Sequence, residues 1–282
     1  MKFSAMFWNV ENFGRYIDDP DKHAQRVARV RDHIRSLDPD LFCLSEIKDK
    51  VSLRNLLLEE FVDYDFGITD GNEQIELLSG WRRGKFEQVL FTQRREFKAD
   101  STNLRPGSLV SARFGGEFYN FLFLHTDSGR NNRDYRNRQD MFEKIWSLKH
   151  TLDDITGGQE PAFFMVKGDL NTMGRSKSGQ FLAVSGEQEI ADLGEDAQSN
   201  GMLLLPKTHD ITWRKGPSDP NFESNLDHSL ATINLEFKLL SNATGQQDAP
   251  VSVDGWNNLG GDERDEFSEF VSDHCSVYCE IL

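Results

Sequence analysis

The sequence predicts a layered α/β protein whose sheets are mixed and largely antiparallel. Short apolar runs bounded by Gly, Asn or Asp recur along its 282 residues, as expected for strands. Amphipathic segments with apolar residues three and four positions apart interrupt these runs and indicate helices. The clearest hairpin joins residues 108–114 to residues 117–126 through Gly115-Gly116. Because hairpins join several of the strands, antiparallel pairing should dominate.

The first half of the chain alternates strands with two helices. Residues 19–40 place Val27 and Ile34 on one apolar face and carry an Asp-Pro pair near each end, which is typical of a capped helix. A second helix is predicted at residues 52–61. The expected strands are residues 2–9, 41–47, 64–69, 75–83, 86–92, 108–114 and 117–126.

The second half repeats this alternation. A long helix is predicted at residues 135–155, and residues 178–194 are expected to be helical in part. The expected strands are residues 161–170, 209–214, 226–232, 235–240 and 275–282. The segment at about 241–262 is rich in Gly, Asn and Asp, and a strand pattern resumes after it. We therefore expect a single domain over residues 1–282 with a loop excursion at 241–262.

Charge and composition limit the function. The net charge is -15, and such a field repels nucleic acid, so the protein should not hold a polyphosphate by charge neutralisation alone. A divalent cation on a carboxylate cluster would still supply local positive charge. The N-terminal residues lack the apolar core of a signal peptide, and no run approaches the roughly 18 apolar residues of a membrane span. We expect a cytoplasmic protein with no stable membrane insertion, and nothing indicates an obligate protein partner.

Polar side chains recur where the predicted strands end or begin. Each has an ordinary explanation as a turn, cap or solvated residue, but in layered α/β folds such ends converge on one face, where sites are built. Carboxylate and amide oxygens suit Mg²⁺ or Mn²⁺, and imidazoles suit proton transfer. No HExxH, CxxC, GxSxG or Walker motif is present. The residues are Asn9, Glu46, His125, Asp169, Asn171, Asp227, Asp273 and His274.

The order of these motifs resembles the endonuclease/exonuclease/phosphatase superfamily over nearly the whole chain. The similar stretches are "FWNVENF", "DPDLFCLSEI", "FLFLHTD", "VKGDLNT", "NLDHSL" and "SDHCSVY". The resemblance implies a four-layer α/β/β/α sandwich and a metal-dependent phosphoesterase. Several positions depart from the usual pattern and suggest a divergent branch, namely Ser45, Leu170, His228 and Cys275.

The resemblance also implies the metal ligands. Glu46 would be the main ligand of a Mg²⁺ or Mn²⁺ ion, with Asn9 beside it. Glu11 falls where some members carry a further acidic residue. Asp273 would be another ligand or a support for the site.

The catalytic roles implied by the resemblance fall on five residues. Asp169 would activate the attacking water, and Asn171 would steady that water and the phosphate. Asp227 would hold the tautomer of His274, which would contact the phosphate or transfer a proton. His125 resembles a second imidazole that protonates the leaving oxygen.

Two assignments stay open. The carboxylate partner of His125 would be Glu73 or Glu76. The basic stretch that follows His125 is either a phosphate-binding patch, with Arg133 and Arg136 as its contacts, or a solvated helix start.

The sequence thus favours a phosphodiesterase or nuclease that attacks a phosphodiester in line with an activated water, so the expected partner is a phosphoester, nucleic acid included. A first alternative is a phosphatase or a sphingomyelinase-like hydrolase of small or lipid phosphoesters. The latter would want an exposed aromatic residue on a membrane-facing loop, and Trp256 is the candidate. A second alternative is a non-catalytic binding module on the same fold.

Overall fold

The computed structural model describes most of the chain, including all the strands that build the candidate site. The described residues are 1–16, 18–48, 59–71, 75–99, 104–158, 160–217, 219, 222–242 and 244–282. The helix predicted at 52–61 therefore lies outside the described residues, except for its end. In the part of the chain that is described, no helix has the length and apolar character needed to cross a membrane.

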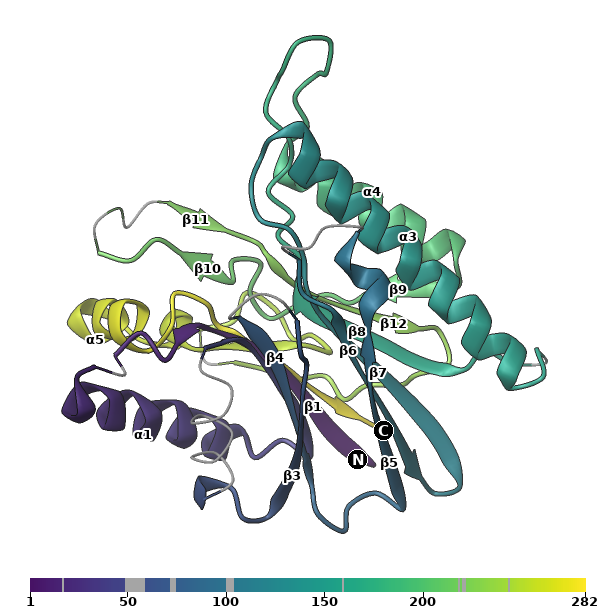
Figure 1. Cartoon of the computed structure of the whole chain (residues 1–282), viewed down its shortest axis with the longest axis horizontal. Coiled ribbons are helices and arrows are strands. Elements are labelled where there is room, and N and C mark those ends of the chain that lie inside the picture. The colour runs from purple at the N-terminus through teal and green to yellow at the C-terminus, as the bar shows by residue number, and fades with distance from the viewer. Residues whose placement is uncertain are drawn as a thin grey trace.

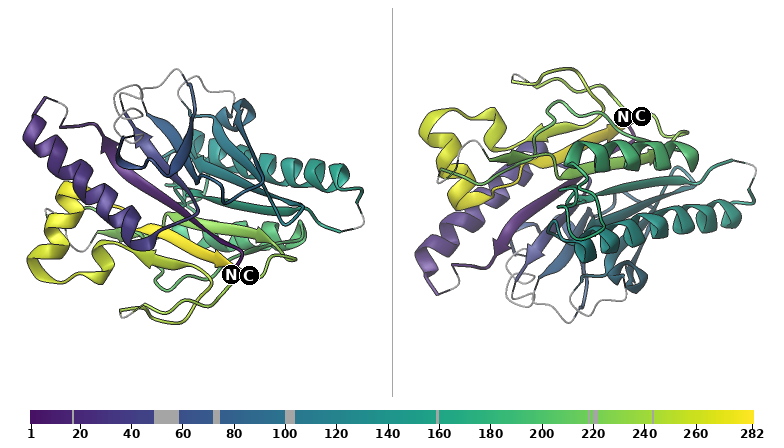
Figure 2. Two further views of the ribbon diagram at one scale, coloured as in Figure 1. Left: turned by 90° about the horizontal axis from the view of Figure 1, so that it is seen from below. Right: turned by 90° about the horizontal axis from the view of Figure 1, so that it is seen from above.

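The first sheet has six strands and contains both ends of the chain. Its strand order is β13 (Ser252–Asp254), β14 (Ser276–Ile281), β1 (Phe3–Phe13), β2 (Leu41–Ile47), β4 (Glu76–Arg82) and β3 (Tyr64–Ile68). The β1–β2 pair is parallel and the other pairs are antiparallel. Phe3 lies opposite Ile281, so the N and C ends lie together in Figures 1 and 2.

The second sheet also has six strands. Its order is β5 (Gln88–Arg94), β6 (Gly107–Phe114), β7 (Glu117–His125), β8 (Phe163–Asp169), β12 (Asp227–Thr232) and β9 (Met202–Leu204). The β7–β8 pair is parallel and the other pairs are antiparallel. The predicted hairpin at Gly115-Gly116 joins β6 to β7.

The two sheets pack face to face, and helices cover their outer faces (Figures 1 and 2). Phe7 and Phe123 belong to the apolar core shared by the two inner faces. Ile34 packs on the outer face of the first sheet, and Met141 and Leu193 pack on the outer face of the second. The covering helices are α1 (Pro20–Leu37), α3 (Asn132–Ile155) and α4 (Gly186–Ser199). The predicted four-layer sandwich of mixed, largely antiparallel sheets is confirmed.

Side-chain caps define where these helices begin. The Asp19 carboxylate accepts a hydrogen bond from the Lys22 amide at the start of α1, where a proline follows the cap. Asn131 accepts hydrogen bonds from two amides of α3, so this helix begins before the predicted Tyr135. An apolar pattern marks the buried face of a helix but not its capped first turn, which explains the difference.

Two predicted strands differ in the structure. Of residues 209–214, only β10 (Trp213–Arg214) is a strand, and it pairs with β11 (Glu223–Ser224) in a separate two-stranded sheet. The strand predicted at 235–240 is wrong, because this segment makes only isolated bridges. The outer edge of β14 explains this, since β13 occupies its first half, from Ser276 to Tyr278, and leaves only a bridge at Ile281 for the segment. Segment 241–262 contains β13, a 3₁₀ turn and the first residues of α5 (Gly261–Glu266).

A histidine beneath the first sheet should make stability depend on pH. His33 of α1 packs against the Trp8 ring at 4.5 Å, and its Nε2 lies 2.9 Å from Ser276 Oγ. Burial lowers the pKa of His33 from 6.5 to about 4. Between these values the unfolded chain binds more protons than the folded one, so stability falls as the pH drops from 6.5 towards 4. The loss attributable to His33 is at most about 3 kcal/mol.

The comparison of urea unfolding at pH 7.5 and pH 4.5 measures this loss. His33→Gln should reduce the difference between the two unfolding free energies, because glutamine does not titrate. His150→Gln is the matched control, since His150 is exposed on α3. An equal pH dependence in the wild type and His33→Gln would contradict the assignment.

Candidate active site

Three neighbouring strands of the second sheet bring together three predicted residues. His125 ends β7 and Asp169 ends β8, and the parallel register pairs them directly. Asp227 begins β12, and the antiparallel register pairs it with Asp169. All three side chains are buried. The alignment follows from topology, because ends of parallel strands and the beginning of an antiparallel strand meet at one edge of a sheet.

The first sheet contributes Asn9 from β1 and Glu46 from β2. The β1–β2 pairing shifts between Asn9 and Phe13, so both strands are irregular where they reach the site. Glu46 has a φ of +64°, an uncommon conformation for a residue other than Gly. Its carboxylate accepts hydrogen bonds from Asn9 Nδ2 (3.1 Å) and the Asn12 amide (2.8 Å). The irregularity therefore turns the Glu46 side chain towards Asn9.

A buried arginine holds this irregular end of β1 in place. Arg26 of α1 is almost fully buried, and its guanidinium donates to the carbonyls of Val10 (2.7 Å), Glu11 (2.6 Å) and Val271 (2.9 Å). Glu11 has a φ of +43°. Charge-assisted hydrogen bonds of this kind offset the cost of a left-handed backbone.

The Asn9 amide connects the two sheets. Its Nδ2 lies 3.1 Å from Glu46 Oε1, 3.0 Å from Asp169 Oδ2 and 3.4 Å from His274 Nε2. Its Oδ1 accepts a hydrogen bond from the Glu11 amide (3.0 Å). In this arrangement Asn9 presents a donor to the carboxylates and has its acceptor engaged elsewhere. Asn9 thus holds Glu46 and Asp169 together.

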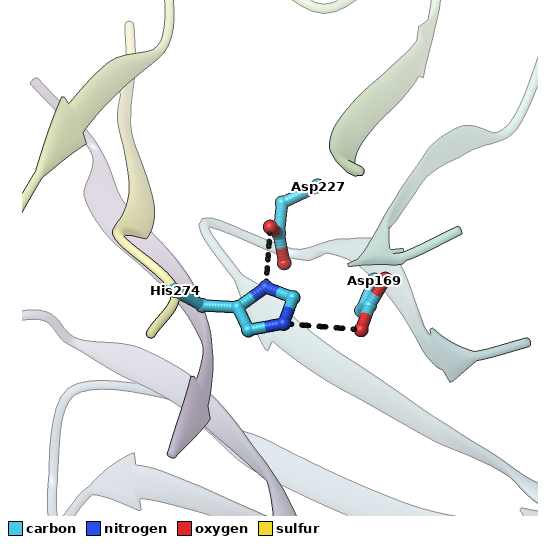
Figure 3. Close-up of side chains that lie close together, drawn as sticks. All are labelled: Asp169, Asp227 and His274. Atoms are coloured by element: carbon cyan, nitrogen blue, oxygen red, sulfur yellow. Dashed lines mark hydrogen bonds and ion pairs between the residues drawn. The ribbon is translucent and has the colours of Figure 1, made fainter. Parts of the chain in front are cut away.

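His274 lies between two carboxylates, as Figure 3 shows. Its Nδ1 is 2.8 Å from Asp227 Oδ2, and its Nε2 is 3.7 Å from Asp169 Oδ2. Trp8 Nε1 donates to the His274 carbonyl (3.0 Å), and the His274 amide donates to Ser272 Oγ (3.0 Å). Asp227 therefore fixes the ring at Nδ1, and Trp8 and Ser272 fix the backbone that carries it.

The adjacent Asp273 has different partners. Its Oδ2 accepts a hydrogen bond from Trp213 Nε1 (2.7 Å), and its carbonyl accepts one from Trp256 Nε1 (2.9 Å). Its Oδ1 is buried without a hydrogen-bond partner in the described structure. Trp256 is 2% exposed, so its suggested role as a membrane-facing aromatic is wrong. The indole rings instead hold the backbone and carboxylate of Asp273.

The carboxylates set the charge state of His274. Burial lowers the pKa of His274, but Asp227, Asp169 and Asp273 together raise it well above 6.5. Burial, with a contribution from Asp227, raises the pKa of Asp169 to about 7, against the lowering effect of His274. A carboxylate with a pKa near neutrality is suited to accept a proton. The centre therefore places a carboxylate that can take up a proton near neutral pH beside an imidazole that carries one.

His125 has the opposite environment. Its Nε2 lies 3.5 Å from Asp169 Oδ2, and burial, followed by the charges of Arg105 and His274, holds its pKa well below 6.5. Its Nδ1 makes no hydrogen bond to the described residues. Glu76 binds elsewhere, accepting hydrogen bonds from Thr69 Oγ1 and from a glycine amide. Glu73 lies outside the described residues.

The remaining predicted residues lie at different distances from this centre. Asn171 adjoins it, since its amide donates to Asp169 Oδ1 (3.1 Å) and its Nδ2 to the Thr126 carbonyl (3.2 Å). Arg133 and Arg136 line a separate cleft of about 310 Å³ beside the start of α3. Within the described structure, neither of them contacts the centre.

The centre has the ligands of a cation site. Asp169, Asp227 and His274 place ligand-type atoms within 4.8 Å of one another, but a cationic imidazole has no lone pair for a metal, so the carboxylates of the centre are the ligands that remain. The donor set also leaves buried carboxylate oxygens without hydrogen-bond partners among the described residues, namely Glu11 Oε2, Asp227 Oδ1 and Asp273 Oδ1. Buried anionic oxygens of this kind are stabilised by a metal. The residues present therefore fit a divalent cation.

The raised pKa of Glu11 is a further sign of excess negative charge in the centre. Burial, followed by the charge of Asp273, raises the pKa of Glu11 to about 7, although Arg15 lies 2.6 Å from Glu11 Oε1. A bound cation would lower this pKa by favouring the carboxylate.

Sequence reasoning missed the basic and indole residues that support the site. Arg105 lies close enough to His125 to affect its pKa, and Arg26 and Trp213 hold the backbone of β1 and the Asp273 carboxylate. Only one feature of the sequence could have indicated a role for Arg105, namely its position just before the predicted strand at 108–114. Arg26 gave only the signal of a charged residue on an otherwise apolar helix face.

Comparison with solved structures finds this fold in other proteins, each at low sequence identity. A Danio rerio TDP2 complexed with single-strand DNA product is 18% identical, with a TM-score of 0.62 over 99% of this chain and 98% of that chain. A mannosyl-6-phosphatase from Bacteroides thetaiotaomicron is 13% identical, with a TM-score of 0.59 over 99% of both chains. An endonuclease/exonuclease/phosphatase from Bacteroides vulgatus is 14% identical, with a TM-score of 0.62 over 99% of this chain and 98% of that chain.

Comparisons of the sequence with family models and with curated proteins give no match. The likeness is therefore one of structure, and it agrees with the motif order read along the chain. The protein has the fold of the endonuclease/exonuclease/phosphatase superfamily.

Proposed function

We propose that the protein is a metal-dependent phosphoesterase that hydrolyses a phosphodiester by in-line attack of an activated water. One observation carries the proposal. A histidine kept cationic by Asp227 lies beside Asp169, a buried carboxylate with a pKa near 7, and beside the Asn9–Glu46 pair. This arrangement combines a base, a cationic donor and a carboxylate cluster in one buried centre.

In the proposed reaction, Asp169 orients the attacking water and accepts its proton. The amide of Asn171 holds the Asp169 carboxylate at Oδ1, leaving Oδ2 directed to the centre. His274 donates hydrogen bonds to the phosphoryl oxygens through Nε2, and Asp227 keeps its Nδ1 protonated. His125 is neutral and orients the leaving oxygen, and the cationic His274 supplies the proton that this oxygen takes up as its bond to phosphorus breaks.

A divalent cation, Mg²⁺ or Mn²⁺, would be held by Glu46 with Asp273 and Glu11. When bound, it supplies positive charge that neutralises the phosphoryl oxygens. The unpartnered oxygens of Glu11 and Asp273 support this set. The hydrogen bond between Asp227 and His274 already engages Nδ1 of the imidazole, so this pair is left out of the metal ligand set, and Asp227 positions His274.

Loss of the Glu46 carboxylate should weaken metal binding. In a calorimetric titration with Mn²⁺, Glu46→Gln should lose more affinity than the roughly 10–100-fold that the loss of an outer-shell hydrogen bond typically costs. Glu195→Gln, at an exposed position of α4, is the matched control. Equal affinities in wild type and Glu46→Gln would exclude Glu46 as a ligand.

A panel of phosphoesters tests the activity itself. The protein is incubated with Mg²⁺ or Mn²⁺ and with plasmid DNA, single-stranded DNA, RNA, sphingomyelin or bis-(4-nitrophenyl) phosphate, and Glu46→Ala is the control. Cleavage above that control supports the proposal. If no substrate is cleaved, the protein is better described as a non-catalytic binding module.

A phosphatase of small phosphomonoesters is the second candidate. The fold of the Bacteroides thetaiotaomicron mannosyl-6-phosphatase favours it, since the comparison covers 99% of both chains. Release of inorganic phosphate from sugar phosphates, at a rate above that for the diesters, would select this candidate.

A further inference from the structure

A groove of about 510 Å³ adjoins the candidate active site. Thr172, which follows Asn171, and Asn225, which closely precedes Asp227, both line it, and Thr172 Oγ1 donates to the Asn225 carbonyl (2.8 Å). The volume falls in the range of small-molecule sites, roughly 300–1,000 Å³. A substrate whose phosphate lies at Asp169 and His274 would therefore extend into this groove.

Four apolar side chains form part of the groove walls. Met173 comes from the segment between β8 and α4, Ile190 comes from α4, and Ile211 and Phe222 come from the chain around the β10–β11 hairpin. The hairpin and the segment leading into α4 lie on the same side of the sandwich in Figure 1. Phe222 is 51% exposed, so an aromatic ring is available at the rim. These walls fit an organic group with an apolar face.

The charges of the groove are mainly negative. Three carboxylates line the groove. Glu223 forms an ion pair with Arg264 (2.5 Å), and Glu187, in the first turn of α4, interacts electrostatically with Arg130. Asp210 makes no hydrogen bond or ion pair with the described residues. The N-terminus of α4, which would otherwise attract an anion, is capped by the Ser185 side chain and carries acidic residues in its first turn. The charge of Asp210 acts on the buried Lys207 and on His209, but its exposed carboxylate has no ion-pair partner among the described residues, and a bound anion would meet it.

We propose that this groove binds one organic arm of the phosphoester and selects an arm that is apolar on one face and neutral or positively charged. The inference rests on the proposed function, since it places the phosphate in the neighbouring centre. A nucleic-acid strand is disfavoured in the groove, because its next phosphate would add negative charge beside Asp210. The selected substrates are small phosphodiesters with a non-anionic arm.

Three chromogenic esters test the selection. They are thymidine 5′-(4-nitrophenyl phosphate), the same ester phosphorylated at its 3′ hydroxyl, and 4-nitrophenyl phosphorylcholine. A unit charge about 4 Å away in water changes an affinity about fivefold. We therefore expect kcat/KM for the 3′-phosphorylated ester to be lower than for the other two esters by about fivefold or more.

Reversing the charge of Asp210 should remove this preference. Asp210→Lys should raise the relative kcat/KM of the 3′-phosphorylated ester by about 25-fold, since two unit charges change and each changes it about fivefold. Glu195→Lys makes the same reversal on α4 outside the groove and should leave the ratio unchanged. Equal kcat/KM values for the three esters, or a ratio that Asp210→Lys does not move, would overturn the inference and leave the hydrolytic function standing.

A binding measurement separates the two proposals if no ester is cleaved. 4-Nitrophenyl phosphorylcholine is titrated calorimetrically into Asp169→Asn protein with and without Asp210→Lys. Weaker binding with Asp210→Lys would support the groove while the hydrolytic function fails. Equal binding, or none at millimolar concentration, would overturn the groove as well.

Discussion

Asp169→Asn should lower the rate of phosphodiester hydrolysis by about 10²–10³-fold, to or below the limit of detection, while the fold stays intact. Asparagine keeps the shape of the side chain and can still accept the Asn171 amide hydrogen bond at its oxygen. It cannot accept a proton from water, and it removes the negative charge that faces His274. The variant thus separates proton transfer from packing. Initial rates with bis-(4-nitrophenyl) phosphate at saturating Mn²⁺ measure the effect.

The controls for this prediction lie in the same assay. His274→Ala should show a loss of similar size, because it removes the cation between Asp227 and Asp169. Asp248→Asn makes the same chemical change at an exposed position and should retain wild-type turnover. The rates are compared at equal purity and with an unchanged circular dichroism spectrum. A near-wild-type rate for either Asp169→Asn or His274→Ala would contradict the catalytic assignment.

Glu189→Gln should destabilise the protein by about 3–5 kcal/mol, the usual cost of leaving one partner of a buried ion pair unmatched. Arg138 and Glu189 have fully buried side chains and form a two-point pair at 2.8 and 3.0 Å. Arg138 also donates to the Gly129 carbonyl (2.8 Å) and to the Gly174 carbonyl (2.8 Å), and Glu189 accepts from the Gly174 amide (2.7 Å). The pair thus ties together the loops that follow His125 and Asn171.

Urea unfolding of single and double variants tests this prediction. Replacing both partners by apolar residues, as in Arg138→Met with Glu189→Leu, should cost less than the sum of the single changes, because no unmatched charge remains. Glu187→Gln is a matched exposed control on α4. A Glu189→Gln variant with wild-type stability would contradict a role for the pair in holding the loops. Arg138 also belongs to the basic stretch that follows His125, but its side chain lies inside the protein, whereas that of Arg133 is exposed.

The sequence predicted the parts of the site that depend on strand order. His125, Asp169 and Asp227 lie where strands end or begin, and neighbouring ends of one sheet must converge. The orientation of the Asn9 amide was not predictable, because it depends on the Glu11 amide, which a local irregularity turns towards Oδ1.

Long-range partners were equally inaccessible to sequence reasoning. Arg26 and Trp213 act on backbone or side-chain groups far away along the chain, so no local pattern indicates their role. The segment 235–240 has the composition of a strand, but a strand also requires a free neighbouring edge. Whether a neighbouring strand edge is free depends on the assembled sheet and cannot be predicted from the segment itself.

The pairing of β1 with β14 constrains when the site can form during synthesis. Asn9 and His274 are neighbours in the fold but 265 positions apart in the sequence, so Asn9 leaves the ribosome well before His274. Until β14 is made, one side of β1 has no hydrogen-bonding partner, and an apolar strand edge of this kind is prone to pair with other chains. The nascent protein should therefore depend on protection of β1, and its candidate site should be complete only after β14 has been added.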